Sequence, residues 1–143
     1  MLRALVKLYA ALEPVGVVQA QVQVIGAYRD LYDQAGLMLR RDDANWLKCG
    51  IEFYEGAQHV SAVVTRDFSD WALVPLQTQP AALWLRLKRQ GTDIQIHYAL
   101  DGTTYTLLRH AYFPPAERLL VGVMAGSPTG TGFEVSFEGF SIS

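Results

Sequence analysis

The sequence predicts an all-β fold, an antiparallel β-sandwich or barrel, and three observations support this prediction. From Val17 onward, apolar and polar residues alternate with a period of two, which is the spacing of half-buried strands. Pairs of turn-forming residues recur between the alternating runs. No helical repeat separates these runs, which argues against a parallel sheet with crossover helices.

Size and composition indicate one folded domain with a real core. The chain has 143 residues, of which 50% are hydrophobic and 18% charged, and its net charge is −2. Nothing in this charge balance suggests a nucleic-acid or membrane partner. The lone cysteine, Cys49, cannot form an internal disulfide, which favours a reducing, cytoplasmic location. No Cys/His spacing of a metal site is present, so no metal or other cofactor is expected.

The first sixteen residues, MLRALVKLYAALEPVG, differ from the rest. Leu2, Leu5, Leu8 and Leu12 recur at helical spacing, and Pro14 with Gly16 ends the run. We therefore expect a short helical or irregular arm over residues 1–16, ahead of a sandwich domain over residues 17–143. A signal peptide is the alternative, against which the charged Lys7 and Glu13 argue. The leucine stripe requires burial, so the arm is expected to cover part of the sandwich or a second copy of the chain.

Valines that alternate with glutamines predict the first strand, over residues 17–28. Further strands are predicted over 35–41, 45–54, 58–66, 70–74, 82–89, 92–100, 104–110, 118–125 and 133–142. The turns between them are Glu55-Gly56, Gln90-Gly91, Asp101-Gly102, Pro114-Pro115 and the SPTGTG stretch at 127–132.

The turns also predict the register of neighbouring strands. A two-residue loop at Glu55-Gly56 and an odd-length loop around 42–44 align apolar residues of three successive strands. The aligned pairs are Ile51–Val60, Cys49–Ala62, Leu47–Val64, Leu39–Leu47 and Leu37–Cys49. A two-residue loop at Gln90-Gly91 would pair Leu87–Ile94, Leu85–Ile96 and Leu83–Tyr98. After the Asp101-Gly102 turn, Tyr105 and Leu107 are expected on the same apolar face.

The opposite face of strands 35–41, 45–54 and 58–66 follows by alternation. It carries the rows Arg40–Trp46–Thr65, Met38–Lys48–Val63 and Gly36–Gly50–Ser61, then Glu52 opposite His59, and then Tyr54. The small third row predicts a trough that another backbone or a ligand can approach closely. A bulge or strong curvature at the two glycines is the alternative.

The hairpin over residues 82–100 presents a similar face, with Trp84 expected opposite His97 and Arg86 opposite Gln95. The candidate ligand-binding residues are therefore Arg40, Trp46, Lys48, Glu52, Ser61, Thr65, Trp84 and Arg86. Each has an ordinary structural alternative: the tryptophans can pack under loops, Arg40 can form a cation–π pair with Trp46, and Glu52–His59 can be a plain cross-strand charge pair. Catalysis has only the weak candidates Glu52 and His59.

Several motifs in order resemble one family. YRDLYDQAGLMLRRDDANWLKCGIEFYEG, VVTRDFSDWALVPL, WLRLKRQGTDIQIHYALDGTTYTLLRHAYFPP and VGVMAGSPTGTGFEVSFEGFSI are similar to the bacterial and fungal domain of unknown function 1349, whose members are often labelled "regulation of enolase" proteins. The resemblance covers about residues 20–142. It implies a concanavalin A-like jelly roll, whose concave sheet often binds sugars in other branches of that superfamily. The family supplies no catalytic residues, and its leading strands are replaced here by the first sixteen residues, which can leave a sheet edge open.

Three functions remain open. The first is a non-catalytic binding module for a carbohydrate or sugar-like metabolite on the concave sheet. The second is a glycoside-active enzyme using Glu52, although no strand shows the alternating carboxylates of such hydrolases. The third is a regulatory domain that binds a protein partner, or a homodimer formed through an open sheet edge. The turn acids Asp42 and Asp43 are a weak calcium signal, since one Asp pair is common in turns.

Overall fold

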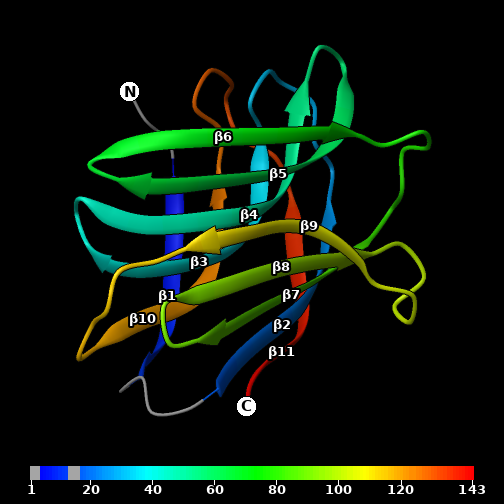
Figure 1. The fold of residues 1–143 in the computed structure, drawn as a ribbon. Coiled ribbons are helices and arrows are strands. Elements are labelled where there is room, and N and C mark those ends of the chain that lie inside the picture. The colour runs from blue at the N-terminus through cyan, green and yellow to red at the C-terminus, as the bar shows by residue number, and fades with distance from the viewer. Residues whose placement is uncertain (1–3, 13–16) are drawn as a thin grey trace.

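A computed structural model describes residues 4–12 and 17–143 of the chain as two antiparallel sheets stacked face to face (Figure 1). The strands are β1 (Ala4–Leu12), β2 (Val17–Gly26), β3 (Gln34–Asp42), β4 (Asn45–Tyr54), β5 (Ala57–Arg66), β6 (Phe68–Pro75), β7 (Leu83–Gln90), β8 (Asp93–Ala99), β9 (Thr106–Tyr112), β10 (Leu119–Gly126) and β11 (Val135–Ile142). No helix able to cross a membrane occurs among the residues so described.

One sheet has six strands in the order β1-β10-β3-β4-β5-β6, and the other has five in the order β11-β2-β7-β8-β9. The all-β antiparallel sandwich predicted from the sequence is confirmed. Each strand expected from Val17 onward is present, with ends within two residues of the prediction. Alternation and turn chemistry were therefore sufficient to place β2 to β11 along the chain.

The helical arm predicted at the N-terminus is wrong for residues 4–12. This segment is strand β1, which pairs antiparallel with β10 from Ala4↔Gly126 to Leu12↔Leu119. A helix this short has little stability of its own, whereas β10 offers a row of backbone donors and acceptors that a strand satisfies. Leu2 and residues 13–16 lie outside the described residues. The division of the chain at residue 16 and the covering role of the leucine stripe stay predictions.

The predicted register is confirmed across β3, β4 and β5, including Leu39↔Leu47, Ile51↔Val60 and Leu47↔Val64. The register predicted for β7 and β8 is wrong by two residues. Gln90 pairs with Asp93, so the loop is Gly91-Thr92, and Leu85 lies opposite Tyr98 instead of Ile96. A shift of two keeps every side chain on its face, so the apolar pattern alone could not detect it.

The core lies between the sheets and contains the residues that alternation assigned to the inner faces. Leu37, Leu47, Leu85 and Ile96 are fully buried, and they are joined by Phe113, which the sequence prediction did not include. Cys49 is buried among them, and this burial raises the pKa of its thiol to about 12. The prediction that Tyr105 and Leu107 lie on the apolar inner face is wrong. Tyr105 contacts Arg86 on the outer face, and Leu107 is 52% exposed and lies opposite His97. A bulge between Ile96 and His97 changes the alternation there.

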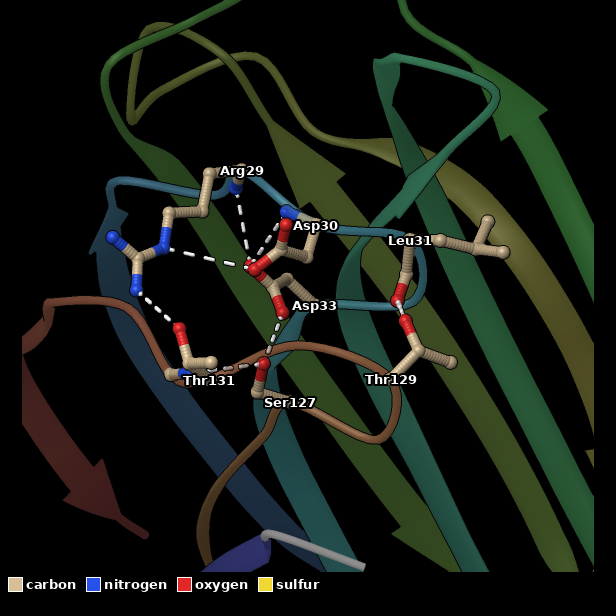
Figure 2. Close-up of polar contacts among 8 residues, drawn as sticks. Arg29, Asp30, Leu31, Asp33, Ser127, Thr129 and Thr131 are labelled. Atoms are coloured by element: carbon tan, nitrogen blue, oxygen red, sulfur yellow. Dashed lines mark hydrogen bonds and ion pairs between the residues drawn. The ribbon is translucent and has the colours of Figure 1, made fainter.

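A buried carboxylate joins two of the loops that cross between the sheets at one end of the sandwich (Figure 2). Asp33 is 0% exposed. Its Oδ2 accepts the backbone N–H groups of Arg29 (3.1 Å) and Asp30 (3.0 Å), and its Oδ1 accepts the Ser127 hydroxyl (2.5 Å). Thr129 donates to the Leu31 carbonyl at 2.6 Å. The loop between β2 and β3 is thereby fixed to the loop between β10 and β11.

Candidate functional site

The outer face of the six-stranded sheet carries the polar rows predicted from the sequence. Arg40↔Trp46↔Thr65, Met38↔Lys48↔Val63 and Gly36↔Gly50↔Ser61 are aligned, followed by Glu52↔His59. Several polar side chains on this face are buried although they point away from the core: Gln34, Glu52, His59, Ser61 and Thr65. They shield one another from solvent, so this face has a polar interior of its own.

Glu52 is the centre of this polar interior. Its side chain is 7% exposed. One carboxylate oxygen, Oε2, accepts the hydroxyl of Ser61 at 2.8 Å and the indole N–H of Trp71 at 3.0 Å. The other oxygen, Oε1, accepts no hydrogen bond from the described residues. A buried carboxylate therefore keeps one oxygen available for a donor from outside.

Lys48 and Gln34 complete the group, and we call Gln34, Lys48, Glu52, Ser61 and Trp71 the Glu52 cluster. The Lys48 ammonium donates to the Gln34 side-chain carbonyl. Burial lowers the pKa of Lys48, and the nearby negative charge of Glu52 partly offsets this effect. The depression beside them, lined by Gln34, Lys48, Gly50, Glu52 and Ser61, has a volume of about 10 Å³, enough for one water.

Aromatic rings border the cluster on one side. The ring of Tyr54 meets Trp71 edge to face at 5.5 Å between centroids and His59 at 5.7 Å, and it stacks on Tyr32 at 6.0 Å. Trp71 is 49% exposed, so much of its surface remains open to solvent. The arrangement places a fixed carboxylate, an ammonium and an amide beside an exposed aromatic surface.

The glycines of the small row allow two strands to approach closely. A Cβ atom on Gly36 would lie 1.8 Å from the Cys49 carbonyl oxygen, and one on Gly50 would lie 2.0 Å from the Ala35 carbonyl oxygen. These contacts lie within the paired strands β3 and β4, so the predicted approach of a ligand or a further backbone to this row stays a prediction. Of the small row, Gly50 and Ser61 line the small depression beside Glu52.

His59 does not contact the Glu52 carboxylate, although the sheet places the two residues opposite each other. Its Nδ1 lies 3.0 Å from the Ala57 carbonyl oxygen, which can only accept, so Nδ1 carries the proton. Glu52 turns instead toward Ser61 and Trp71. The pairing in the sheet is confirmed, but no hydrogen bond joins the two weak catalytic candidates.

The remaining candidates on this face lie toward the other end of the strands. Arg40 pairs with Asp43 instead of stacking on Trp46, so the expected cation–π contact is not formed. Thr65 shares a 2.7 Å hydrogen bond with Ser69. Trp46 precedes Glu52 by six residues, or about 20 Å at about 3.3 Å per residue. Arg40, Trp46 and Thr65 are therefore separate from the Glu52 cluster.

Trp84 and Arg86 lie on the outer face of the five-stranded sheet, on the opposite side of the sandwich. The predicted cross-strand partners are wrong, because Trp84 is opposite Ala99 and Arg86 is opposite His97. This follows from the two-residue shift between β7 and β8. The eight predicted binding residues are thus distributed over the two opposite outer faces of the sandwich.

Sequence reasoning missed Trp71 and Gln34. The alternation in 70–74 was visible, but the register of this strand against β5 was not predicted. The turn at Asp67, which has a φ of 62°, pairs Arg66 with Phe68 and sets Trp71 opposite Val63. Had the sequence analysis assigned a tight turn to Asp67, the resulting register would have predicted Trp71 on the outer face. No group of three or more His, Cys, Asp or Glu residues able to hold a metal is found in the described ranges.

The chain matches the model of a family described as "Protein of unknown function (DUF1349)" over residues 7–143. It is 40% identical over 124 residues to "Regulation of enolase protein 1" of Saccharomyces cerevisiae, covering 87% of this chain and 63% of the relative. It is 28% identical over 122 residues to "Uncharacterized protein AN7484" of Emericella nidulans, covering 80% and 61%. The chain therefore spans less than two thirds of these curated relatives. Both are fungal, so a bacterial origin finds no support.

Solved structures give the same fold. A functionally unknown protein from Saccharomyces cerevisiae matches with a TM-score of 0.87 and 38% identity, over 94% of this chain and 73% of that one. The GH43 protein BlXynB of Bacillus licheniformis matches at 0.79 and 16%, over 91% and 28%. The carbohydrate-binding module CBM66 of Bacillus subtilis matches at 0.66 and 12%, over 98% and 81%. The last two likenesses concern the fold alone.

Proposed function

The chain belongs to the DUF1349 family, and from this premise we propose that it is a non-catalytic module that binds a carbohydrate or sugar-like metabolite at the Glu52 cluster. The observation that carries the proposal is the free carboxylate oxygen of the buried Glu52 beside the half-exposed ring of Trp71. A sugar presents hydroxyl donors and an apolar ring face, and the cluster offers a partner to each.

The cluster is already ordered before a ligand arrives. Ser61 and Trp71 hold one oxygen of Glu52, and Gln34 holds the Lys48 ammonium. A ligand hydroxyl can donate to the second carboxylate oxygen and accept from Lys48 without a large rearrangement of side chains. Such ordering lowers the entropy lost on binding. The small depression accommodates a hydroxyl group, while the sugar ring rests on the exposed aromatic surface.

The fold comparisons support this proposal only in part. The sandwich is similar to a carbohydrate-binding module, to part of the GH43 protein BlXynB and to part of a xylan β-1,4-xylosidase. These identities are too low to transfer a ligand, but they suggest β-1,4-linked xylan oligosaccharides as the first ligands to test. Trp46, Arg40 and Thr65 would contact a longer oligosaccharide that extends along β4.

A glycoside-active enzyme based on Glu52 is a weaker proposal. Glycosidases of the common retaining and inverting types need two carboxyl groups on either side of the scissile bond. The residues that line the depression include Glu52 but no second carboxylate. Incubation with nitrophenyl xylosides and xylohexaose, followed by chromatography, distinguishes turnover from binding.

A regulatory protein-interaction domain is the second candidate, because the sheet edge at β6 exposes apolar side chains. Phe68 is 85% exposed and Val74 is 38% exposed. The name of the yeast relative, "Regulation of enolase protein 1", indicates regulation of enolase, but it identifies no partner surface. An edge strand of this kind can add a strand from a protein partner or from a second copy of the chain. A Phe68→Lys variant that loses self-association in solution would support this alternative.

The direct test is calorimetric titration with xylohexaose. Glu52→Gln removes the charge and should weaken binding at least tenfold, and Trp71→Ala should do the same. Glu117→Gln, at an exposed glutamate outside the cluster, is the matched control and should leave binding unchanged. If Glu52→Gln and Trp71→Ala both bind xylohexaose as tightly as the wild type does, the Glu52 cluster is not the binding site.

A further inference from the structure

The outer face of the five-stranded sheet carries a second polar depression. It has a volume of about 280 Å³, and its lining includes Gln21, Gln23, Trp84, Arg86, Tyr105 and Glu138. We call these six residues the Trp84 site. The residues come from β2, β7, β11 and the loop before β9, and they lie on the side of the sandwich opposite the Glu52 cluster. None of them belongs to the site proposed above.

Trp84 is held in a fixed position by the turn that follows β8. A Cβ atom on Gly102 would lie only 3.0 to 3.3 Å from the indole ring, so the backbone of the turn packs directly against it. Asp101 stabilises this turn by accepting the backbone N–H groups of Thr103 (2.9 Å) and Thr104 (2.8 Å). The indole is thus half-buried against the turn and still lines the depression. This combination gives a rigid aromatic surface that loses little entropy on binding.

Arg86 is oriented with its hydrogen-bonding groups unused. Its guanidinium carbon lies 3.9 Å above the centre of the Tyr105 ring, a cation–π arrangement that fixes the plane of the group. Its Nε is shielded from solvent and has no acceptor among the described residues. The guanidinium also forms no ion pair with them. An oriented donor group without a partner is the expected state of a site awaiting an acceptor.

The other polar side chains of the Trp84 site are also unpaired. Gln21 lies beside Arg86, Gln23 lies beside Trp84, and Glu138 lies beside Gln23. The side chains of these three residues form no hydrogen bond with one another or with other described side chains. A bulge between Glu138 and Ser141, where Gly139 has a φ of 62°, bends β11 at the rim of the depression. The site therefore offers both hydrogen-bond donors and hydrogen-bond acceptors around one aromatic surface.

The charges of the depression favour a neutral ligand. Arg86 and Glu138 carry opposite charges, and the two glutamines are neutral. Burial, together with the positive charges of Arg86 and Lys88, lowers the pKa of His97, so this neighbour of Arg86 is neutral at neutral pH. A phosphate or sulfate group would find one cation and one carboxylate here. Vicinal hydroxyl groups, by contrast, match the paired donors and acceptors of amide, guanidinium and carboxylate groups.

We propose that the Trp84 site binds one neutral pyranose residue of a polysaccharide, independently of the Glu52 cluster. The sugar ring packs on Trp84, and its hydroxyl groups bond to Gln21, Gln23, Arg86 and Glu138. The volume of about 280 Å³ suits a single ring better than a larger ligand. Two sites on opposite faces would allow one module to contact two glycan chains, which strengthens attachment to a polysaccharide through multivalency.

The three tryptophans of the chain allow each face to be observed separately. Two-dimensional ¹H–¹⁵N NMR resolves their indole N–H signals, which report the Trp84 site through Trp84 and the opposite face through Trp46 and Trp71. The full-length protein is titrated with xylohexaose and with cellohexaose, up to about 10 mM, and with inorganic phosphate as the anion probe. We expect a saturable shift of the Trp84 signal with at least one hexasaccharide and none with phosphate.

Variants then assign the contacts. Gln21→Ala with Arg86→Met should weaken the Trp84 response at least fivefold, and the backbone spectrum shows whether the fold is retained. Lys88→Ala, one row beyond the depression, is the matched control and should leave the response unchanged. A Trp84 signal that does not move with either hexasaccharide overturns the proposal, as does a shift with phosphate alone. A Trp84 shift without a Trp71 shift would support this site while contradicting the proposed function of the Glu52 cluster.

Discussion

The indole N–H of Trp71, on the edge strand β6, donates to the Glu52 carboxylate of β4 at 3.0 Å, across the intervening strand β5. The sheet register sets Trp71 opposite Val63 and Glu52 opposite His59, so the two residues are not neighbours in the ladder. Only the direction of the indole brings them together. This contact ties an edge strand to the centre of the outer face and keeps one oxygen of Glu52 occupied.

Replacing Trp71 with Phe should destabilise the protein and weaken ligand binding together. The substitution keeps an aromatic ring but removes the hydrogen bond to Glu52, which is worth about 1.5–3 kcal/mol because the acceptor is charged. Urea unfolding followed by far-UV circular dichroism measures this loss. Trp46→Phe is the control, because the Trp46 indole forms no hydrogen bond with the described residues. Equal losses in the two variants would show that the Glu52 contact contributes nothing specific.

Asp33→Asn should weaken the attachment of the two crossing loops. The amide cannot accept at both positions at once, so at least one of the Arg29, Asp30 and Ser127 donors loses its acceptor in a buried site. The expected loss is about 2–3 kcal/mol in the free energy of unfolding. Asp43→Asn, at a carboxylate whose side chain is 100% exposed, should leave the stability nearly unchanged. Thermal unfolding of both variants provides the comparison.

Gly36→Ala should be among the most damaging single substitutions in the sheet. The new methyl group would lie 1.8 Å from the Cys49 carbonyl oxygen, so β3 and β4 would have to separate. We expect a loss of about 3 kcal/mol or more, or failure to fold. Gly91→Ala meets no atom within 4 Å and should cost only about 1 kcal/mol, through its φ of 60°. Similar unfolding midpoints for the two variants would contradict the close approach of the strands.

The turn beside Trp84 should show a dependence on pH that is due to Asp101. Hydrogen bonds from the Thr104 and Thr103 backbone lower the pKa of Asp101 from 3.8 to about 2. Because the pKa of this carboxyl group is lower in the folded state, its ionised form stabilises the folded state at any pH well above the unfolded-state pKa of 3.8. This contribution is lost as the pH falls through about 2. The stability difference between wild type and Asp101→Ala should therefore be constant above pH 5 and shrink below pH 4. A constant difference from pH 2 to pH 7 would show that the carboxylate charge has no role.

Deleting residues 1–15 should expose the edge of β10. In the described segment, β1 supplies backbone hydrogen bonds to β10 along most of its length. Without them, an apolar strand becomes an edge and is free to pair with another chain. We expect a lower melting temperature and a larger solution mass by light scattering. An unchanged melting temperature together with an unchanged mass would show that this segment does not stabilise the sandwich.

Sequence alone determined where β2 to β11 lie along the chain, with ends within two residues, and the register of β3, β4 and β5. It could do so because alternation assigns each side chain to a face, and the Glu55-Gly56 turn, together with three apolar pairs, fixes the alignment. The sequence therefore places Lys48, Ser61 and Glu52 in the rows that the structure shows.

The tertiary structure alone decided the features that alternation leaves unspecified. A two-residue slip between β7 and β8 preserves every face, so only the observed pairing of Gln90 with Asp93 reveals it. The distribution of strands between the two sheets places Trp84 and Arg86 on the face opposite Glu52. Residues 4–12 have helical spacing in the sequence, but they form a strand because they pair with the edge of β10. The hydrogen bond between Trp71 and Glu52 depends on the orientation of the Trp71 side chain, which reaches across strand β5. Each of these depends on packing between segments far apart in the chain, which local periodicity does not encode.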